Sequence, residues 1–183
     1  MLYSFEITLE DSDYVNFNIH NAKVYDIFKR QVLFLRILFA AALLLFSVME
    51  ILKNDVLFEN VLFSVFIFIF LVIFELFIPR LFLALTRVQV IRFIRKGRAP
   101  YSRSSHIEFF EDGFTEITEH ANMQLKYSSI EKLSFDEVTK TLYLHFNKAS
   151  ATIVPRSAFA TPEEMVDFLI FIKGKCVDAE CLF

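Results

Sequence analysis

Two long apolar stretches, residues 32–52 and 56–78, constrain this chain more than any other feature. Only Lys53, Asn54 and Asp55 separate them. A helix needs about 20 apolar residues to cross the ~30 Å hydrocarbon core of a bilayer. The rest of a 183-residue chain is too short to cover two such helices on every side. The pattern therefore predicts a transmembrane helical hairpin over residues 32–86, with buried helices of a soluble protein as the alternative. Pro79 is expected to kink or end the second helix, because it lacks an N–H donor.

Basic residues predict how this hairpin is oriented. Between Arg80 and Arg103 the chain has seven Lys and Arg and no acid, whereas residues 53–59 at the inter-helix turn have one Lys and two acids. Lys and Arg are retained on the cytoplasmic side of a membrane. We therefore expect a multi-pass protein of the bacterial inner membrane with both termini in the cytoplasm. About thirty mixed polar residues precede the first stretch, too many for the n-region of a cleaved signal peptide.

Two groups of charged residues are candidates for membrane contacts. The first group is expected to bind anionic lipids of the cytoplasmic leaflet, and each of its cations contributes on the order of 1 kcal/mol. It consists of Arg87, Arg92, Arg95, Lys96 and Arg98. The second is an intramembrane ion pair. In a hairpin centred near residues 54–55, Arg36 lies opposite Ile73 and within reach of Glu75. Snorkelling of each charge to the headgroups is the alternative.

The N-terminal segment, residues 1–31, has a strand followed by a helix. Apolar and polar residues alternate from Tyr3 to Leu9, which is typical of a half-buried strand. One strand is not stable alone, so we expect it to join a sheet formed beyond the hairpin. Asp11 or Ser12 is expected to cap a helix over residues 13–30 that runs into the first span.

After the hairpin, residues 87–105 are predicted to form a basic helix and a polar linker, and residues 106–183 a cytoplasmic β domain. Period-two alternation predicts six short strands between His106 and Val154, with Asp112-Gly113 in a tight hairpin of positive φ angles. The last helix spans residues 162–173, with Thr161 as N-cap, Glu164 completing a capping box and Gly174 after its last turn. The predicted fold class is thus α+β, a membrane hairpin with an antiparallel, partly open barrel or sandwich and a C-terminal capping helix.

Three segments of the β domain resemble the YcxB-like bacterial membrane proteins. They are Ile107 to Phe114, Tyr127 to Leu133 and Ile153 to Phe159. The order of strand, helix, two-span hairpin and β domain is similar as well. This resemblance implies a C-terminal module similar to a pleckstrin-homology-type (PH-like) domain. The family has no assigned catalytic residues, so the resemblance transfers no site.

The sequence shows no pattern of enzymatic chemistry. The four histidines are far apart and outside any metal-binding motif, and three glycines are too few for a phosphate-binding loop. We therefore predict no catalytic residue, no metal, no cofactor and no enzymatic activity. From Ser104 onward, 13 acidic side chains stand against seven basic ones, which disfavours nucleic acid as a partner.

Three functional classes remain. The leading one is a non-enzymatic membrane protein whose PH-like module binds a protein partner as a scaffold or regulator, with an exposed strand edge as the binding place. The first alternative is an immunity protein that neutralises a bacterial toxin. The second alternative is a sensor of anionic lipid.

Overall fold

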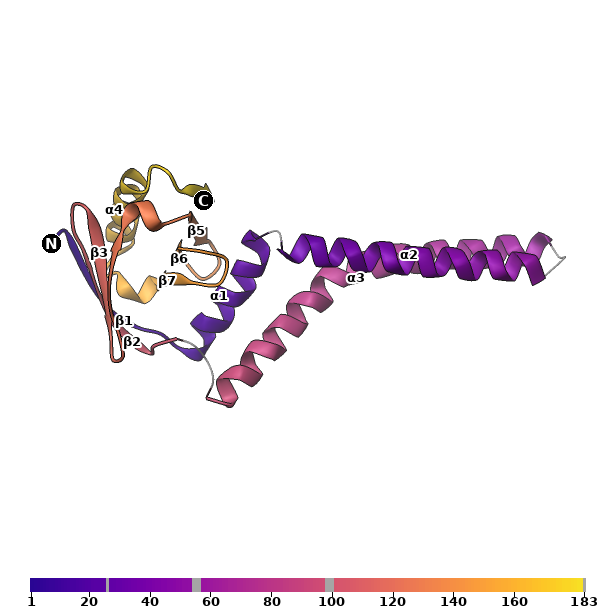
Figure 1. Ribbon diagram of the computed structural model, residues 1–183, viewed down its shortest axis with the longest axis horizontal. Coiled ribbons are helices and arrows are strands. Elements are labelled where there is room, and N and C mark those ends of the chain that lie inside the picture. Colours follow the sequence, from indigo (N-terminus) through magenta and orange to yellow (C-terminus); the bar gives the residue numbers. More distant parts are fainter. Residues whose placement is uncertain (26, 54–56, 98–100, 183) are drawn as a thin grey trace. The chain divides into compact units, whose positions relative to one another are not determined.

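The computed structural model describes residues 1–25, 27–53, 57–97 and 101–182, with only the backbone at 27, 28, 31, 50, 51, 53, 57–61, 64, 71 and 75. Its elements, shown in Figure 1, are β1 (Tyr3–Thr8), α1 (Asp11–Val24), α2 (Ile27–Lys53), α3 (Leu57–Arg95), β2 (Ser104–Phe109), β3 (Gly113–Thr118), β4 (Asn122–Lys126), β5 (Lys132–Asp136), β6 (Thr141–His145), β7 (Ala151–Val154), α4 (Pro162–Lys175) and β8 (Glu180–Leu182). Two short 3₁₀ turns, η1 (Tyr127–Ser129) and η2 (Arg156–Ala158), follow β4 and β7. The chain forms two compact units, residues 25–89 and a β domain of residues 1–24 with 90–183.

The β domain has two four-stranded sheets. Sheet A has the order β1-β2-β3-β4 and sheet B the order β7-β6-β5-β8. In sheet A, β1 pairs antiparallel with β2, from Tyr3 opposite Phe109 to Thr8 opposite Ser104. The N-terminal strand thus finds its partner beyond both long helices, as its alternating pattern requires. The described strands form two open sheets and no closed barrel.

The main core lies between the two sheets and is covered by α4. Phe168 of α4 is fully buried, and its ring lies 5.0 Å from Phe5 of β1 and 4.9 Å from Phe109 of β2. Sheet B contributes Leu133, Leu142, Leu144 and Val154 to the same core. Burial of several aromatic rings of this size supplies most of the driving force for packing the sheets together.

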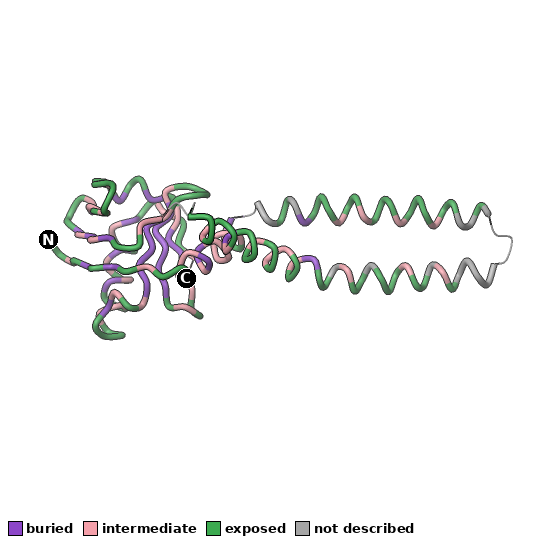
Figure 2. Tube along the Cα trace, turned by 90° about the horizontal axis from the view of Figure 1, so that it is seen from below, coloured by how far each residue is buried: buried purple, intermediate pink, exposed green. Residues whose placement is uncertain are grey.

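The other face of sheet B is covered by α1. Phe17 of α1 packs against Tyr143 of β6 and Ile153 of β7 in a second, smaller core. Every residue of β6 is therefore buried, since one face meets sheet A and the other meets α1. Figure 2 shows this concentration of buried residues in the β domain and the mostly exposed surface of the long helices.

The second unit consists of α2 and most of α3, two antiparallel helices joined by aromatic contacts. The ring centroids of Phe39 and Phe70 are 5.9 Å apart, and those of Phe46 and Phe63 are 5.7 Å apart. Both pairs are symmetric about the point between residues 54 and 55, which is the expected register of the hairpin. Within these helices, Val32–Met49 and Val65–Arg95 are long and apolar enough to cross a membrane.

The helices begin and end at other residues than predicted in two places. The N-terminal helix does not run into the first apolar stretch, because α1 ends at Val24 and α2 starts at Ile27. Its first turn is capped by Asp13, whose carboxylate accepts a hydrogen bond from the backbone N–H of Glu10 at 2.8 Å. The second apolar helix does not end at Pro79, since α3 is continuous to Arg95 and includes the predicted basic helix.

Two predictions for the end of the chain were incomplete. Thr161 caps α4 by accepting from the N–H of Glu164, as expected, but the helix continues through Gly174 to Lys175. An eighth strand, β8, pairs parallel with β5. Three residues are too few for alternation to identify a strand, so the sequence did not show it.

Gly113 is needed for close approach of two strands and not for a positive φ angle. The only described residues with positive φ are Lys140 and Gly97, so the prediction for Asp112-Gly113 was wrong in this respect. A Cβ atom on Gly113 would lie 2.3 Å from the carbonyl oxygen of Leu125 on β4. Backbone atoms cannot yield to such a contact without moving β4 away from β3.

We expect Gly113→Ala to destabilise the β domain by about 1–3 kcal/mol, because the added methyl group forces the two strands apart. Gly174→Ala is the matched control, since a Cβ there meets nothing within 4 Å and Ala is the better helix former. Chemical denaturation of the purified chain should show a lower midpoint for the first variant and an equal or higher one for the second. Equal midpoints for Gly113→Ala and the unmodified chain would contradict the close approach.

Candidate functional site

The β domain has an open cleft between the free edges of its two sheets. The edge strands on this side are β4 of sheet A and β7 of sheet B. The cleft has a volume of about 420 Å³. Its lining combines apolar and polar side chains, among them Leu9, Glu116, Thr118, Met123, Phe146 and Thr152.

A carboxylate lies within this cleft. Among the described residues that line it, Glu116 of β3 is the only Asp, Glu, Lys or Arg. Its side chain is half-buried, and Oε2 accepts a hydrogen bond from the Thr152 hydroxyl of β7 at 2.6 Å. Burial raises the pKa of Glu116, and the hydrogen bond from Thr152 opposes this shift only in part. The cleft therefore contains a partly desolvated acid, which suits a positively charged group.

Within the described part of the chain, the adjoining strand β4 is an edge strand, with β3 as its one neighbour in the sheet. Thr118 donates its N–H to the carbonyl of Ala121. In an antiparallel pair every second residue bonds to the neighbouring strand, so the backbone groups of Ala121, Met123 and Leu125 face β3. The backbone groups of Asn122, Gln124 and Lys126 consequently point away from the sheet. All of β4 except Leu125 is exposed. A strand edge of this kind can pair with an added strand.

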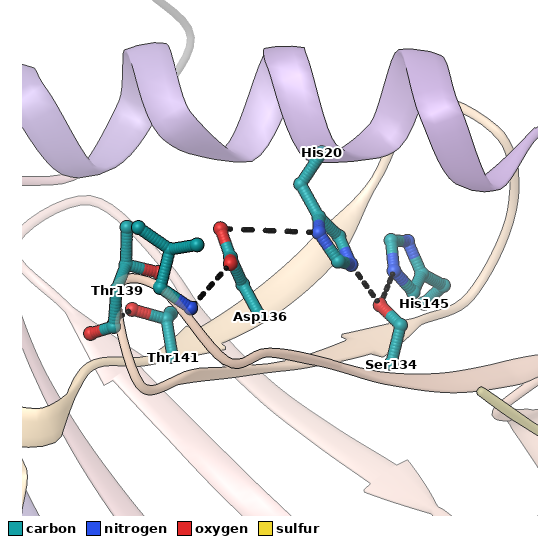
Figure 3. A network of polar contacts seen from close by, with 7 residues as sticks. His20, Ser134, Asp136, Thr139, Thr141 and His145 are labelled. Atoms are coloured by element: carbon teal, nitrogen blue, oxygen red, sulfur yellow. Dashed lines mark hydrogen bonds and ion pairs between the residues drawn. The ribbon is translucent and has the colours of Figure 1, made fainter. Parts of the chain in front are cut away.

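A separate polar network is buried under α1 (Figure 3). The hydroxyl of Ser134 on β5 lies 3.0 Å from Nε2 of His20 and 2.8 Å from Nε2 of His145. Asp136 lies 4.0 Å from the other ring nitrogen of His20. A hydroxyl has one hydrogen, so it donates to one imidazole and accepts from the other. The network thus fixes opposite roles for the two Nε2 atoms.

This network joins α1 to sheet B and does not form an accessible nucleophile. The order of Asp136, His20 and Ser134 is that of a catalytic triad. Ser134 and His145 are, however, each 0% exposed, and the hydroxyl is held from both sides by imidazoles. A substrate would reach Ser134 only if α1 moved off the sheet. We therefore assign these residues a structural role in holding α1.

Burial lowers the pKa of both histidines in the network. The pKa of His145 falls to about 4, with smaller contributions from His20 and Lys132. Burial lowers the pKa of His20 as well, although the charge of Asp136 opposes this shift. Both imidazoles are therefore neutral at pH 7, which removes the cost of burying a charge.

Four of the five predicted lipid-binding residues lie within the described part of the chain. Arg87, Arg92 and Arg95 are exposed on α3, and exposed Lys96 follows directly. Positions 92, 95 and 96 share one helical face by their spacing. Arg98 lies outside the described residues.

The predicted ion pair remains a prediction. Arg36 is half-buried on α2, but the side chain of Glu75 lies outside the described residues. The register of the aromatic contacts places the two positions near each other along the helices.

Sequence reasoning missed both Glu116 and the histidine network. His20 and Ser134 are 114 positions apart, so no local spacing could connect them. A usable signal was present in β6, where Tyr143 and His145 occupy the face opposite Leu142 and Leu144. Two aromatic rings on a supposed solvent face indicate that another element covers it. Glu116 was detectable as an acid two positions after Phe114, where alternation requires an apolar residue.

These features define an α+β protein with two long apolar helices and a two-sheet domain. Residues 109–172, from the end of β2 into α4, match the family model of YcxB-like protein. The match confirms the resemblance over this segment, which is therefore YcxB-like, and does not extend to the two long helices. No curated protein and no solved structure matches the chain significantly.

We expect the β domain to lose stability as the pH falls from about 6.5 to 4, because unfolded His145 binds a proton in this range and folded His145 does not. The shift from an ordinary value of about 6.5 corresponds to a loss of about 3 kcal/mol. Thermal denaturation at pH 7 and at pH 4.5 measures this loss as the difference in stability between the two pH values. The replacement His145→Gln should remove most of that difference. The control His120→Gln alters a side chain that is 82% exposed and should follow the unmodified chain. Three parallel pH profiles would show that His145 is not buried in its neutral form.

Proposed function

We propose that this chain is a non-enzymatic protein of the bacterial inner membrane that presents its β domain to a protein partner in the cytoplasm. The observation that supports it best is the exposed edge of β4 beside the open cleft. There the partner adds an extended strand, and its backbone pairs with Asn122 and Gln124. Backbone pairing supplies affinity, and the cleft supplies selectivity.

Membrane insertion of α2 and α3 is supported by their surfaces. Their exposed residues are predominantly Leu, Ile, Val and Phe, including Phe34, Leu44, Phe66 and Leu76. Soluble proteins rarely expose apolar surface of this extent. The pairing of β1 with β2 adds a constraint on topology. Because β1 precedes α2 and β2 follows α3, both flanks of an inserted pair lie on one side of the membrane.

The basic end of α3 supports the cytoplasmic side and a contact with lipid headgroups. Arg92, Arg95 and Lys96 are exposed there, and basic residues remain on the cytoplasmic side. Their charges attract the anionic lipids of that leaflet. In this proposal the cluster anchors the domain near the membrane surface.

A PH-like architecture for the β domain is part of the proposal. It is supported by the strand order, in which an antiparallel sheet of four strands precedes three consecutive strands of a second sheet. The helix α4 then follows and covers the core between the sheets. The immunity and lipid-sensor alternatives stay predictions.

The topology is tested by labelling single cysteines in intact cells. In a background with Cys176→Ala and Cys181→Ser, cysteines are introduced at Ser4, Ser157 and Asn54, the last outside the described residues. An impermeant maleimide should label only position 54 in intact cells and all three positions after permeabilisation, because the basic residues keep both flanks inside. Labelling of position 157 in intact cells would contradict the proposed topology.

Strand addition is tested with a library of random heptapeptides on the purified full chain in lipid nanodiscs. We expect selected peptides to lose about tenfold or more in affinity for Gln124→Pro, because proline removes the outward N–H that pairs with the added strand.

The matched control is Gln124→Ala, which keeps the backbone N–H and should bind like the unmodified chain. Proline is tolerated at an edge strand where its N–H position faces solvent, and a melting curve checks this. Equal binding by both variants, or no selected peptide, would refute strand addition at β4.

A further inference from the structure

We propose that the cleft between β4 and β7 binds a lysine or arginine side chain of the partner strand, with the Glu116 carboxylate as its counter-ion. This inference rests on the proposed function, since the strand that pairs with β4 also supplies the basic side chain. It adds the chemical class of residue that the partner must carry.

The register of sheet A places Glu116 within reach of such a side chain. Glu116 pairs with Met123 across β3 and β4, so both side chains project to the same side of the sheet. Both also line the cleft. A strand added beside β4 directs every second side chain to that same side. A long basic side chain can therefore lie along Met123 with its apolar stem and reach Glu116 with its charged end.

The chemistry of the cleft favours a cation over other occupants. The described lining contains one carboxylate and no Lys or Arg, and apolar Leu9, Phe146 and Ile153 lie around it. A half-buried carboxylate loses part of its hydration, and a cation restores that stabilisation. An acidic or phosphorylated side chain would meet repulsion instead. The excess of acids from Ser104 onward adds a longer-range attraction for a basic segment.

Thr152 gives this subsite a defined geometry. Its hydroxyl, on a residue only 2% exposed, holds one oxygen of Glu116 from the opposite sheet. The carboxylate is thereby oriented before any ligand arrives. A preorganised acceptor limits the entropy lost when the partner binds.

The test uses the same heptapeptide library on the full chain in phosphatidylcholine nanodiscs, whose lipids do not compete for basic peptides. The unmodified chain should enrich peptides with Lys or Arg at one fixed position. Glu116→Gln should lose this enrichment and bind those peptides about tenfold more weakly, because one partner of the charge pair is gone. The control Glu119→Gln removes the same charge from a side chain that is 81% exposed and should keep the enrichment.

A second measurement does not depend on the folding of a variant. Carbodiimide coupling of a selected lysine peptide to the unmodified chain should form an amide with Glu116, identified by mass spectrometry. Peptides selected at β4 without a basic position, a preference that persists in Glu116→Gln, or coupling only to other carboxylates would overturn the inference and leave strand addition intact. Failure to select any peptide would overturn both.

Discussion

The pairing of β1 with β2 is the constraint on which the rest of this structure depends. It joins two strands that are separated in sequence by α1 and by both long apolar helices. Loop-closure entropy rises only slowly with length, and two rigid antiparallel helices return the chain close to its starting point. The pairing brings Phe5 and Ile7 into the core between the sheets, where they contact residues that follow the helices. The β domain is thus incomplete without the first nine residues, and the helical pair is tied to it at both ends.

The position of α1 follows from the same pairing. The chain leaves β1 at Thr8, and α1 crosses the outer face of sheet B. That face carries Tyr143, His145 and Ser134, a mixture that would be costly to bury without partners. His20 meets this requirement by contacting the Ser134 hydroxyl, while Phe17 covers the tyrosine ring. Hydrogen bonds and apolar contacts therefore act together to fix the helix. Burial lowers the pKa of both imidazoles, so we expect acid to weaken this attachment.

Much of the fold could be predicted from the sequence because its signals are local. Alternation marked β1, and Thr161 with Glu164 marked the start of α4. What could not be predicted depends on contacts distant in sequence. The helix α1 ends at Val24 and a bend follows at Tyr25 in a stretch of sequence without Gly or Pro, so no local signal marks this end. The network of His20, Ser134 and His145 exists only after α1 has packed on sheet B. For the site, the sequence indicated a strand edge in general terms, whereas β4 and Glu116 required the sheet order and register.

Two polar residues explain why the cleft, the open seam between the two sheets, is not closed. Closing a barrel here would require β4 to pair with β7 and the inward positions near the seam to be apolar. Glu116 and Thr152 occupy such positions and bond to each other across the sheets at 2.6 Å. Sealing this pair in an apolar core would remove the remaining hydration of the carboxylate, which costs several kcal/mol without a cation. The acid therefore favours a seam that stays accessible, and it leaves β4 as an edge with free backbone groups. In the binding that we propose, the same carboxylate provides the charge that selects the partner strand.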